Sequence, residues 1–204
     1  MSKIVIDPGH GGVTNHAKGP KGTLEKNAAL TIAVKTAEIL NQAGHDVVLT
    51  RNSDTNVALA DRAKVAANKK ADVFVSIHFN GNADPKVQGT ECWVHPAAGS
   101  DSKLLASSLL QRLVQVTGYK NRGLFSGKLI VLSPSIHFAT TAACLIEISF
   151  ITNPTDEDRL LTVAYQNQLA NGISVAITDY IKKSTTITPL NAAPGVIPEG
   201  EGNM

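Results

Sequence analysis

Four side chains stand out because their chemistry is unusual for their places in the sequence. His10 lies between glycines just after an apolar run that stops at a proline, and His78 ends a second apolar run. Glu25 falls in the first turn of an expected helix. Two imidazoles and one carboxylate form the ligand set of a catalytic zinc site that keeps a fourth position open for water. His10, Glu25 and His78 are therefore candidate metal ligands.

The fourth residue, Glu147, is a lone carboxylate inside the most apolar segment of the chain. Such a group is costly to bury unless it is paired, hydrogen-bonded or close to a metal. A carboxylate beside a metal-bound water is a natural general base. Each of the four residues also has an ordinary structural interpretation; for Glu147 it is a buried ion pair with Arg51 or Arg122.

The elements that must position these residues alternate between strands and helices. We expect strands over residues 3–8, 45–50, 71–79, 89–95, 129–132 and 142–150, and helices over 23–43 with Thr23 as N-cap, 57–69, 101–116 and 156–183 with a break near Thr162. This order predicts an α/β domain with a central, mostly parallel twisted sheet of about six strands and helices on both faces. Functional sites in such sheets lie at strand ends.

Composition limits the remaining classes of protein. With 204 residues, 43% hydrophobic and 18% charged, the chain fits one soluble domain, expected over residues 1–183. A net charge of +2 is too small to indicate a nucleic-acid partner, and no apolar run reaches the roughly 18 to 20 residues of a membrane span. Residues 184–204 are rich in Pro, Thr and Gly and predict a linker or disordered tail. Cys92 and Cys144 are expected to be buried thiols.

Five sequence blocks extend the pattern around the four residues. They occur in the order IDPGHGG (6–12), LEKN (24–27), SIHFN (76–80), NRGL (121–124) and LIEISFITNP (145–154). In type and order they resemble the zinc-dependent N-acetylmuramoyl-L-alanine amidases of the Amidase_3 type, over about residues 3–181. Five ordered blocks are far more specific than any one of them.

The resemblance implies roles for the four residues and a substrate. His10, Glu25 and His78 would hold one Zn²⁺, and Glu147 would be the catalytic acid/base. The scissile bond would be the amide that joins the lactyl group of N-acetylmuramic acid to L-alanine of the peptidoglycan stem peptide. Zinc-activated water would attack this amide while Glu147 takes a proton and passes it to the leaving amine.

Three other functions stay open from the sequence. They are a zinc hydrolase of another amide, a cell-wall-binding module without catalysis, and a structural zinc domain, which would favour a closed and often cysteine-rich site. The chain shows no signal segment before its first strand. We therefore expect action at the bacterial wall after release as a phage or spore lysin, or as the catalytic domain of a longer protein with a wall-binding module beyond residue 204. Some members of the family that this chain resembles carry a long helix that blocks the zinc. Here the predicted elements fill the span between His78 and Glu147, so we expect a site that is open to substrate.

Overall fold

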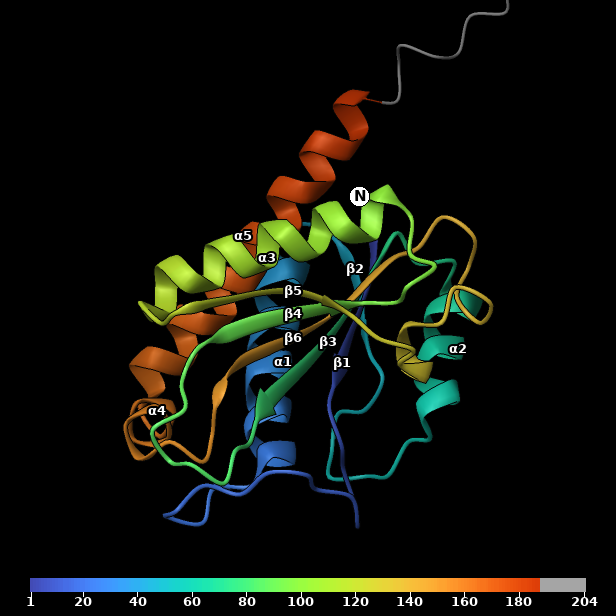
Figure 1. Cartoon of the computed structure of the whole chain (residues 1–204). Helices are drawn as coiled ribbons and strands as arrows, with labels where there is room; N and C mark the ends of the chain where they lie inside the picture. Colours follow the sequence, from blue (N-terminus) through green and yellow to red (C-terminus); the bar gives the residue numbers. More distant parts are fainter. Residues whose placement is uncertain (188–204) are drawn as a thin grey trace, which may run out of the picture.

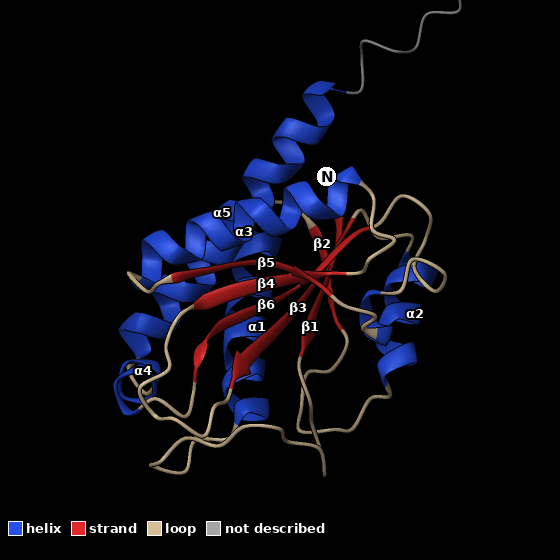
Figure 2. Cartoon of the chain, in the orientation of Figure 1, coloured by secondary structure: helices blue, strands red, loops and turns tan. Residues whose placement is uncertain are grey.

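The computed structural model describes residues 1–187, with side chains up to residue 184. Its centre is one six-stranded sheet in the order β2-β1-β3-β6-β4-β5 (Figures 1 and 2). The strands are β1 (Lys3–Pro8), β2 (Asp46–Leu49), β3 (Val73–Asn80), β4 (Thr90–Val94), β5 (Asn121–Ser126) and β6 (Ala142–Phe150). Strands β2, β1, β3 and β6 are parallel, whereas β4 runs antiparallel to β6 and β5 runs parallel to β4. The predicted mostly parallel α/β sheet is confirmed.

Helices lie on both faces of the sheet, but they cover the two faces unequally. Helices α1 (Glu25–Gln42), α3 (Ser100–Thr117) and α5 (Val163–Ile187) pack on one face, where they bury the larger core. The short α4 (Pro154–Leu160) precedes α5. On the other face, α2 (Leu59–Lys69) and the 3-10 helix η1 (Ile130–Leu132) pack near β1 and β6 (Figure 1). Strands β4 and β5 contact α3, which lies on the same face as α1 and α5. The α2 face of β4 therefore borders a cavity instead of a helix.

Alternation along the strands supplies both cores. In β3, Val73, Val75 and Ile77 belong to the larger core, and Phe74 belongs to the smaller core on the α2 face. Successive side chains of a strand point to opposite faces, so each apolar run contributes to both layers. His78 continues the series of Phe74 and therefore points to the α2 face, where the helical cover is thinner.

Several predicted elements differ from the structure. The strand expected over 129–132 is the 3-10 helix η1, whose Val131 and Leu132 pack into the smaller core. The sixth strand is instead β5, in a segment predicted as a loop; its residues are largely exposed, so backbone pairing with β4 and not an apolar pattern makes it a strand. Helix α1 begins after Leu24, not after Thr23 as N-cap.

At the C-terminal end, the predicted break near Thr162 is confirmed by the separation of α4 and α5. Helix α5 extends to Ile187, past the expected boundary at residue 183, and the rest of the predicted tail lies outside the described residues. None of the described helices is long and apolar enough to cross a membrane.

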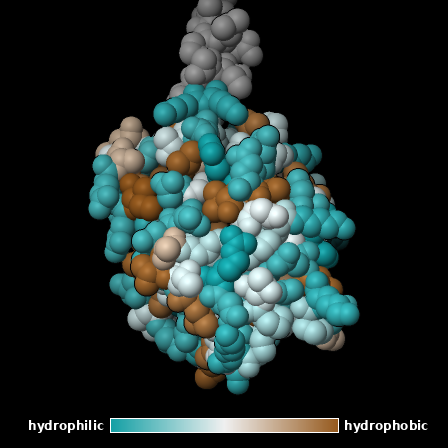
Figure 3. All heavy atoms as spheres, turned by 90° about the vertical axis from the view of Figure 1, so that its left-hand side faces the viewer, coloured by the Kyte–Doolittle hydropathy of each residue, from teal (hydrophilic) through white to brown (hydrophobic). Residues whose placement is uncertain are grey.

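Both cysteines are free, fully buried thiols in the larger core, as predicted. The side of the molecule that carries α4 is drawn as a surface in Figure 3, where hydrophobic residues form separate spots among hydrophilic ones. Scattered apolar side chains of this kind are normal on a protein surface and do not indicate an interaction face.

Candidate metal centre

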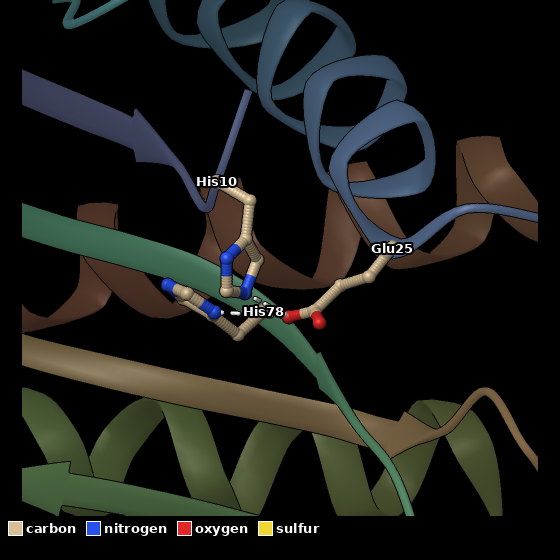
Figure 4. Close-up of side chains that lie close together, drawn as sticks. All are labelled: His10, Glu25 and His78. Atoms are coloured by element: carbon tan, nitrogen blue, oxygen red, sulfur yellow. Dashed lines mark hydrogen bonds and ion pairs between the residues drawn. The ribbon is translucent and has the colours of Figure 1, made fainter. Parts of the chain in front are cut away.

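Three predicted ligands meet although they come from three separate elements. His10 lies on the loop after β1, Glu25 begins α1, and His78 lies near the end of β3 (Figure 4). Glu25 Oε1 is 3.1 Å from His10 Nε2 and 3.0 Å from His78 Nδ1. One ligand atom from each residue lies within 4.8 Å of the other two. The structure thus brings together all three residues that the sequence singled out.

The Glu25 carboxylate is buried and held from several directions. Its Oε2 accepts a hydrogen bond from the Ala17 backbone N–H, and its Oε1 accepts one from the Phe79 N–H. Burial alone would raise the pKa of Glu25, but hydrogen bonds from His10 and His78 and the charges of these two imidazoles lower it to about 2. Glu25 is therefore a fixed anion near neutral pH, as a metal ligand must be.

The loop that carries His10 is held in an unusual conformation. His10 has φ 58°, in the left-handed region that side chains other than glycine seldom adopt. The preceding Gly9 lets the loop approach β3, because a Cβ at Gly9 would lie 2.4 Å from Cε1 of His78. A side chain at position 9 would therefore displace the imidazole of His78 from its place beside His10.

Two buried arginines hold this loop by its carbonyl oxygens. Arg51 donates from Nε to Pro8 O and from Nη2 to Gly9 O. Arg62 donates from Nη1 to Pro8 O and from Nη2 to His10 O, at 2.6 Å each. Three consecutive carbonyls are thus bound by guanidinium groups, which offer several donors in a fixed geometry. These contacts offset the strain at His10.

A buried carboxylate, that of Asp7, neutralises the positive charge of Arg62. Its Nη1 lies 2.8 Å from Oδ1 of Asp7, and both side chains are almost completely buried. Asp7 Oδ2 also accepts a hydrogen bond from the Ser76 hydroxyl. The alanine-rich sequence of α2 contained a signal for this arrangement, since Arg62 is a charged residue on its buried face. Sequence reasoning did not assign a role to it.

Glu147 lies in a row of polar residues that crosses the sheet. His78 of β3 and Glu147 of β6 are register partners, and Glu147 is in turn the register partner of Glu91 of β4. Oε2 of Glu147 is buried and has no hydrogen-bond partner among the described residues. Burial raises the pKa of Glu147 well above its usual range, and the charges of Glu25 and Glu91 raise it further.

Neither arginine that could have paired with Glu147 does so. Arg51 binds backbone carbonyls, and Arg122 binds Glu91, with 2.7 Å between Nε and Oε2. Glu91 also accepts hydrogen bonds from Asn80 Nδ2 and Trp93 Nε1. Glu91 was missed in the sequence, although strand alternation in TECWV places it on the same face as the only tryptophan.

The four predicted site residues line one cavity of about 330 Å³: they are His10, Glu25, His78 and Glu147. Glu91, Trp93 and His16 line it as well. The side chains of His10 and His78 are 22% and 16% exposed, so the cluster is open to solvent. His137, in contrast, is buried against Phe74 and does not line this cavity. The cavity places reactive side chains where a ligand can reach them.

The donor chemistry of the cluster fits a zinc ion. Two imidazole nitrogens and one carboxylate oxygen are hard-to-intermediate donors; they come from the ends of two inner strands and the start of a helix, and no cysteine belongs to the cluster. The unpartnered carboxylate oxygen of Glu147 beside this set is the second sign that a polar group belongs in the cavity. The arrangement suits hydrolysis by an activated water.

Comparison with known proteins gives consistent results. A sequence model of a family described as N-acetylmuramoyl-L-alanine amidase (Amidase_3) matches residues 4–179. The chain is 29% identical to the N-acetylmuramoyl-L-alanine amidase AmiA of Escherichia coli, over 87% of this chain and 75% of that protein. It is 33% identical to the amidase LytC of Bacillus subtilis over 88% of this chain, which spans only 35% of LytC.

A solved structure agrees with both sequence matches. The fold superposes on the amidase AmiC2 of Nostoc punctiforme with a TM-score of 0.81 and 36% sequence identity. The match covers 89% of this chain and 97% of that structure. The likeness therefore extends over nearly the whole described domain.

Proposed function

This chain belongs to the Amidase_3 family of N-acetylmuramoyl-L-alanine amidases, and we propose that it hydrolyses the amide between N-acetylmuramic acid and L-alanine in peptidoglycan. The observation that carries the proposal is the convergence of His10, Glu25 and His78 beside the half-buried side chain of Glu147. This arrangement offers a ligand set and a proton carrier in one cavity, which is what metal-assisted amide hydrolysis needs.

His10 Nε2, His78 Nδ1 and Glu25 Oε1 are the atoms that would hold one zinc ion. A zinc ion bound there supplies a Lewis acid that acidifies water and polarises an amide carbonyl. The chain contributes the rigidity of the three ligands. The His10 loop is fixed by Arg51 and Arg62, and the Glu25 carboxylate is fixed by two backbone N–H groups. Fixed ligands need little rearrangement during the reaction.

Glu147 is the residue that would move the proton. Burial raises the pKa of Glu147, which makes its carboxylate a stronger base than that of an exposed glutamate and suits it to accept a proton from water. The protonated carboxyl can then donate to the amine of L-alanine as the C–N bond breaks. One product carries the muramoyl carboxylate, and the other carries a free N-terminal alanine.

The setting follows from the substrate. Because peptidoglycan lies outside the cytoplasmic membrane, we expect the protein to act at the bacterial cell wall. We assign the catalytic domain to the segment that ends with α5, which extends past the expected boundary at residue 183 to Ile187. Any wall-binding module beyond residue 204, and release in the manner of a phage or spore lysin, remain predictions from the sequence.

The test is digestion of purified peptidoglycan sacculi with zinc-loaded protein, followed by mass analysis of the products. We expect intact stem peptides with free N-terminal alanine, and no release after treatment with a chelator. Glu147→Ala should retain zinc and lose hydrolysis by about 10³-fold or more. Cleavage within peptides or removal of acetyl groups from sugars would point to another amide, and wild-type turnover by Glu147→Ala would remove that residue from the mechanism.

A further inference from the structure

Two cavities meet at the metal-binding histidines. The first, here called the Trp93 cavity, has a volume of about 330 Å³ and includes Trp93, Glu91 and Glu147. The second, here called the Leu59 cavity, has a volume of about 380 Å³ and includes Leu59, Val57 and Val131. Both are lined by His10 and His78. The histidines therefore stand between two separate recesses.

This arrangement matches the form of the substrate, if the proposed function is accepted as the starting point. The scissile amide has a sugar on its carbonyl side, attached through the lactyl group, and a peptide on its nitrogen side. When the amide lies beside His10, His78 and Glu147, the two halves must extend away from it in different directions. Each cavity can then receive one half.

The lining of the Trp93 cavity suits a sugar ring. Trp93 lines it and stacks on Phe125, with ring centroids 5.0 Å apart. The indole is fixed in orientation by the hydrogen bond from Nε1 to Glu91 Oε1 at 3.2 Å. A pyranose combines an apolar C–H face with a rim of hydroxyl donors, so it matches an aromatic wall beside carboxylate and amide acceptors. Glu91 and Asn80 supply such groups in this cavity.

The Leu59 cavity is apolar and has no unpaired acid. Leu59 is 54% exposed at the start of α2, and Val57 and Val131 complete an apolar lining. The one acid that lines it, Asp7, is neutralised by Arg62. Such a recess suits the methyl group and backbone of an alanyl peptide.

We propose that the Trp93 cavity binds the N-acetylmuramoyl sugar and that the Leu59 cavity binds the alanyl end of the stem peptide. Trp93 and Leu59 are then specificity-determining residues for opposite halves of one substrate. A substitution of Trp93 should therefore affect only substrates that carry the sugar, whereas a substitution of Leu59 should affect every substrate that carries the peptide.

A direct test uses the fact that Trp93 is the only tryptophan of the chain. The N-methylamide of the β-methyl glycoside of N-acetylmuramic acid, whose lactyl group is an uncharged amide as in the substrate, and the dipeptide L-Ala-D-isoGln are titrated separately into the zinc-loaded protein while tryptophan emission is recorded. The sugar should shift or quench the emission with saturation at roughly millimolar concentration, as expected for a small neutral ligand. The dipeptide should leave the emission unchanged. A response to the dipeptide and none to the sugar would overturn the assignment.

A kinetic test compares N-acetylmuramoyl-L-Ala-D-isoGln with D-lactoyl-L-Ala-D-isoGln, which keeps the scissile amide and lacks the sugar. Trp93→Ala should lower kcat/KM about tenfold on the first compound only, with Trp93→Phe as a milder variant that retains an aromatic ring. Leu59→Ser should lower kcat/KM on both compounds. Val163→Ala, an exposed apolar position on α5, is the matched control and should change neither.

The outcomes separate this proposal from the proposed function. Sugar-dependent emission without hydrolysis of either compound would refute the activity and leave the sugar site standing. Hydrolysis with an equal loss for Trp93→Ala on both compounds would refute the sugar site and leave the activity standing.

Discussion

The two sides of the cluster are built in different ways. On the side of β1 and α2, the His10 loop is held by buried guanidinium groups on three consecutive carbonyls, with Asp7 as the counter-charge. On the side of β4 and β5, Glu91 gathers Asn80, Trp93 and Arg122 at a cavity wall near the edge of the sheet.

The difference separates rigidity from recognition. On the first side the arginines bind backbone carbonyls, so a change there alters the position of His10, a candidate metal ligand. On the second side Glu91 contacts only other side chains, and the Arg122 side chain is 32% exposed. Substitutions there should therefore reduce the free energy of unfolding less. The site thus combines a rigid ligand side with a wall that can vary. Four substitutions test this contrast, taken from the largest expected effect to the smallest.

The largest effect is expected from Arg62→Ala. It leaves the Asp7 carboxylate buried without its cation and removes donors from Pro8 O and His10 O. Breaking a buried pair in this way costs about 3–5 kcal/mol in the free energy of unfolding. Urea unfolding of the metal-free protein measures it, with Arg112→Ala, which breaks an exposed ion pair, as control. A loss below about 1 kcal/mol would show that the His10 loop does not depend on the arginine.

Gly9→Ala should act on the metal ligands more than on the fold. The added Cβ would lie 2.4 Å from Cε1 of His78, so the imidazole must move. We expect zinc affinity to fall about 100-fold, in the range seen when ligand support is lost. Competition with a chromophoric chelator measures it. Gly99→Ala, where a Cβ meets nothing within 4 Å, should leave zinc affinity unchanged.

Glu91→Gln tests the wall. The amide can still accept hydrogen bonds from Asn80 and Trp93, but the ion pair with Arg122 is lost, for about 1 kcal/mol of stability. Removing this charge also takes away one cause of the raised pKa of Glu147. The acidic limb of kcat/KM against pH should therefore move to lower pH. An unmoved limb would show that the two carboxylates do not interact.

The smallest expected effect is a gain in stability. In the metal-free protein, the raised pKa of Glu147 means that the folded state resists an ionisation that the unfolded state undergoes freely. Below the unfolded pKa near 4.5 both states are protonated and the penalty is absent; it grows as the pH rises above that value. Glu147→Gln should thus add about 1 kcal/mol at pH 7 and nothing near pH 3. Equal stability at pH 7, measured by thermal unfolding in chelator, would contradict the buried unpaired carboxylate.

The sequence singled out the four residues of the cluster, but it did not single out the residues that hold them in place. His10, Glu25, His78 and Glu147 are conspicuous because each is a polar residue in an apolar or glycine-rich setting. Arg51 and Arg62 are not, because a cation near a helix or a strand end usually faces water, and only the folded chain shows which carbonyls it reaches. Pairing also explains the errors at the sheet edge. Strand β5 forms because its backbone can pair with the free edge of β4. Such pairing does not require an apolar pattern, and the sequence NRGLFS shows none.

The order of the site residues along the chain has a consequence for folding. All three candidate metal ligands lie within the first 78 residues, whereas Glu147 lies on β6, which enters the sheet between β3 and β4. Its pairing with β3 closes a long loop and is a contact of high sequence separation, which forms slowly. During synthesis the ligand segments emerge before the acid/base does. The chain therefore becomes competent for hydrolysis only when its last strand has docked.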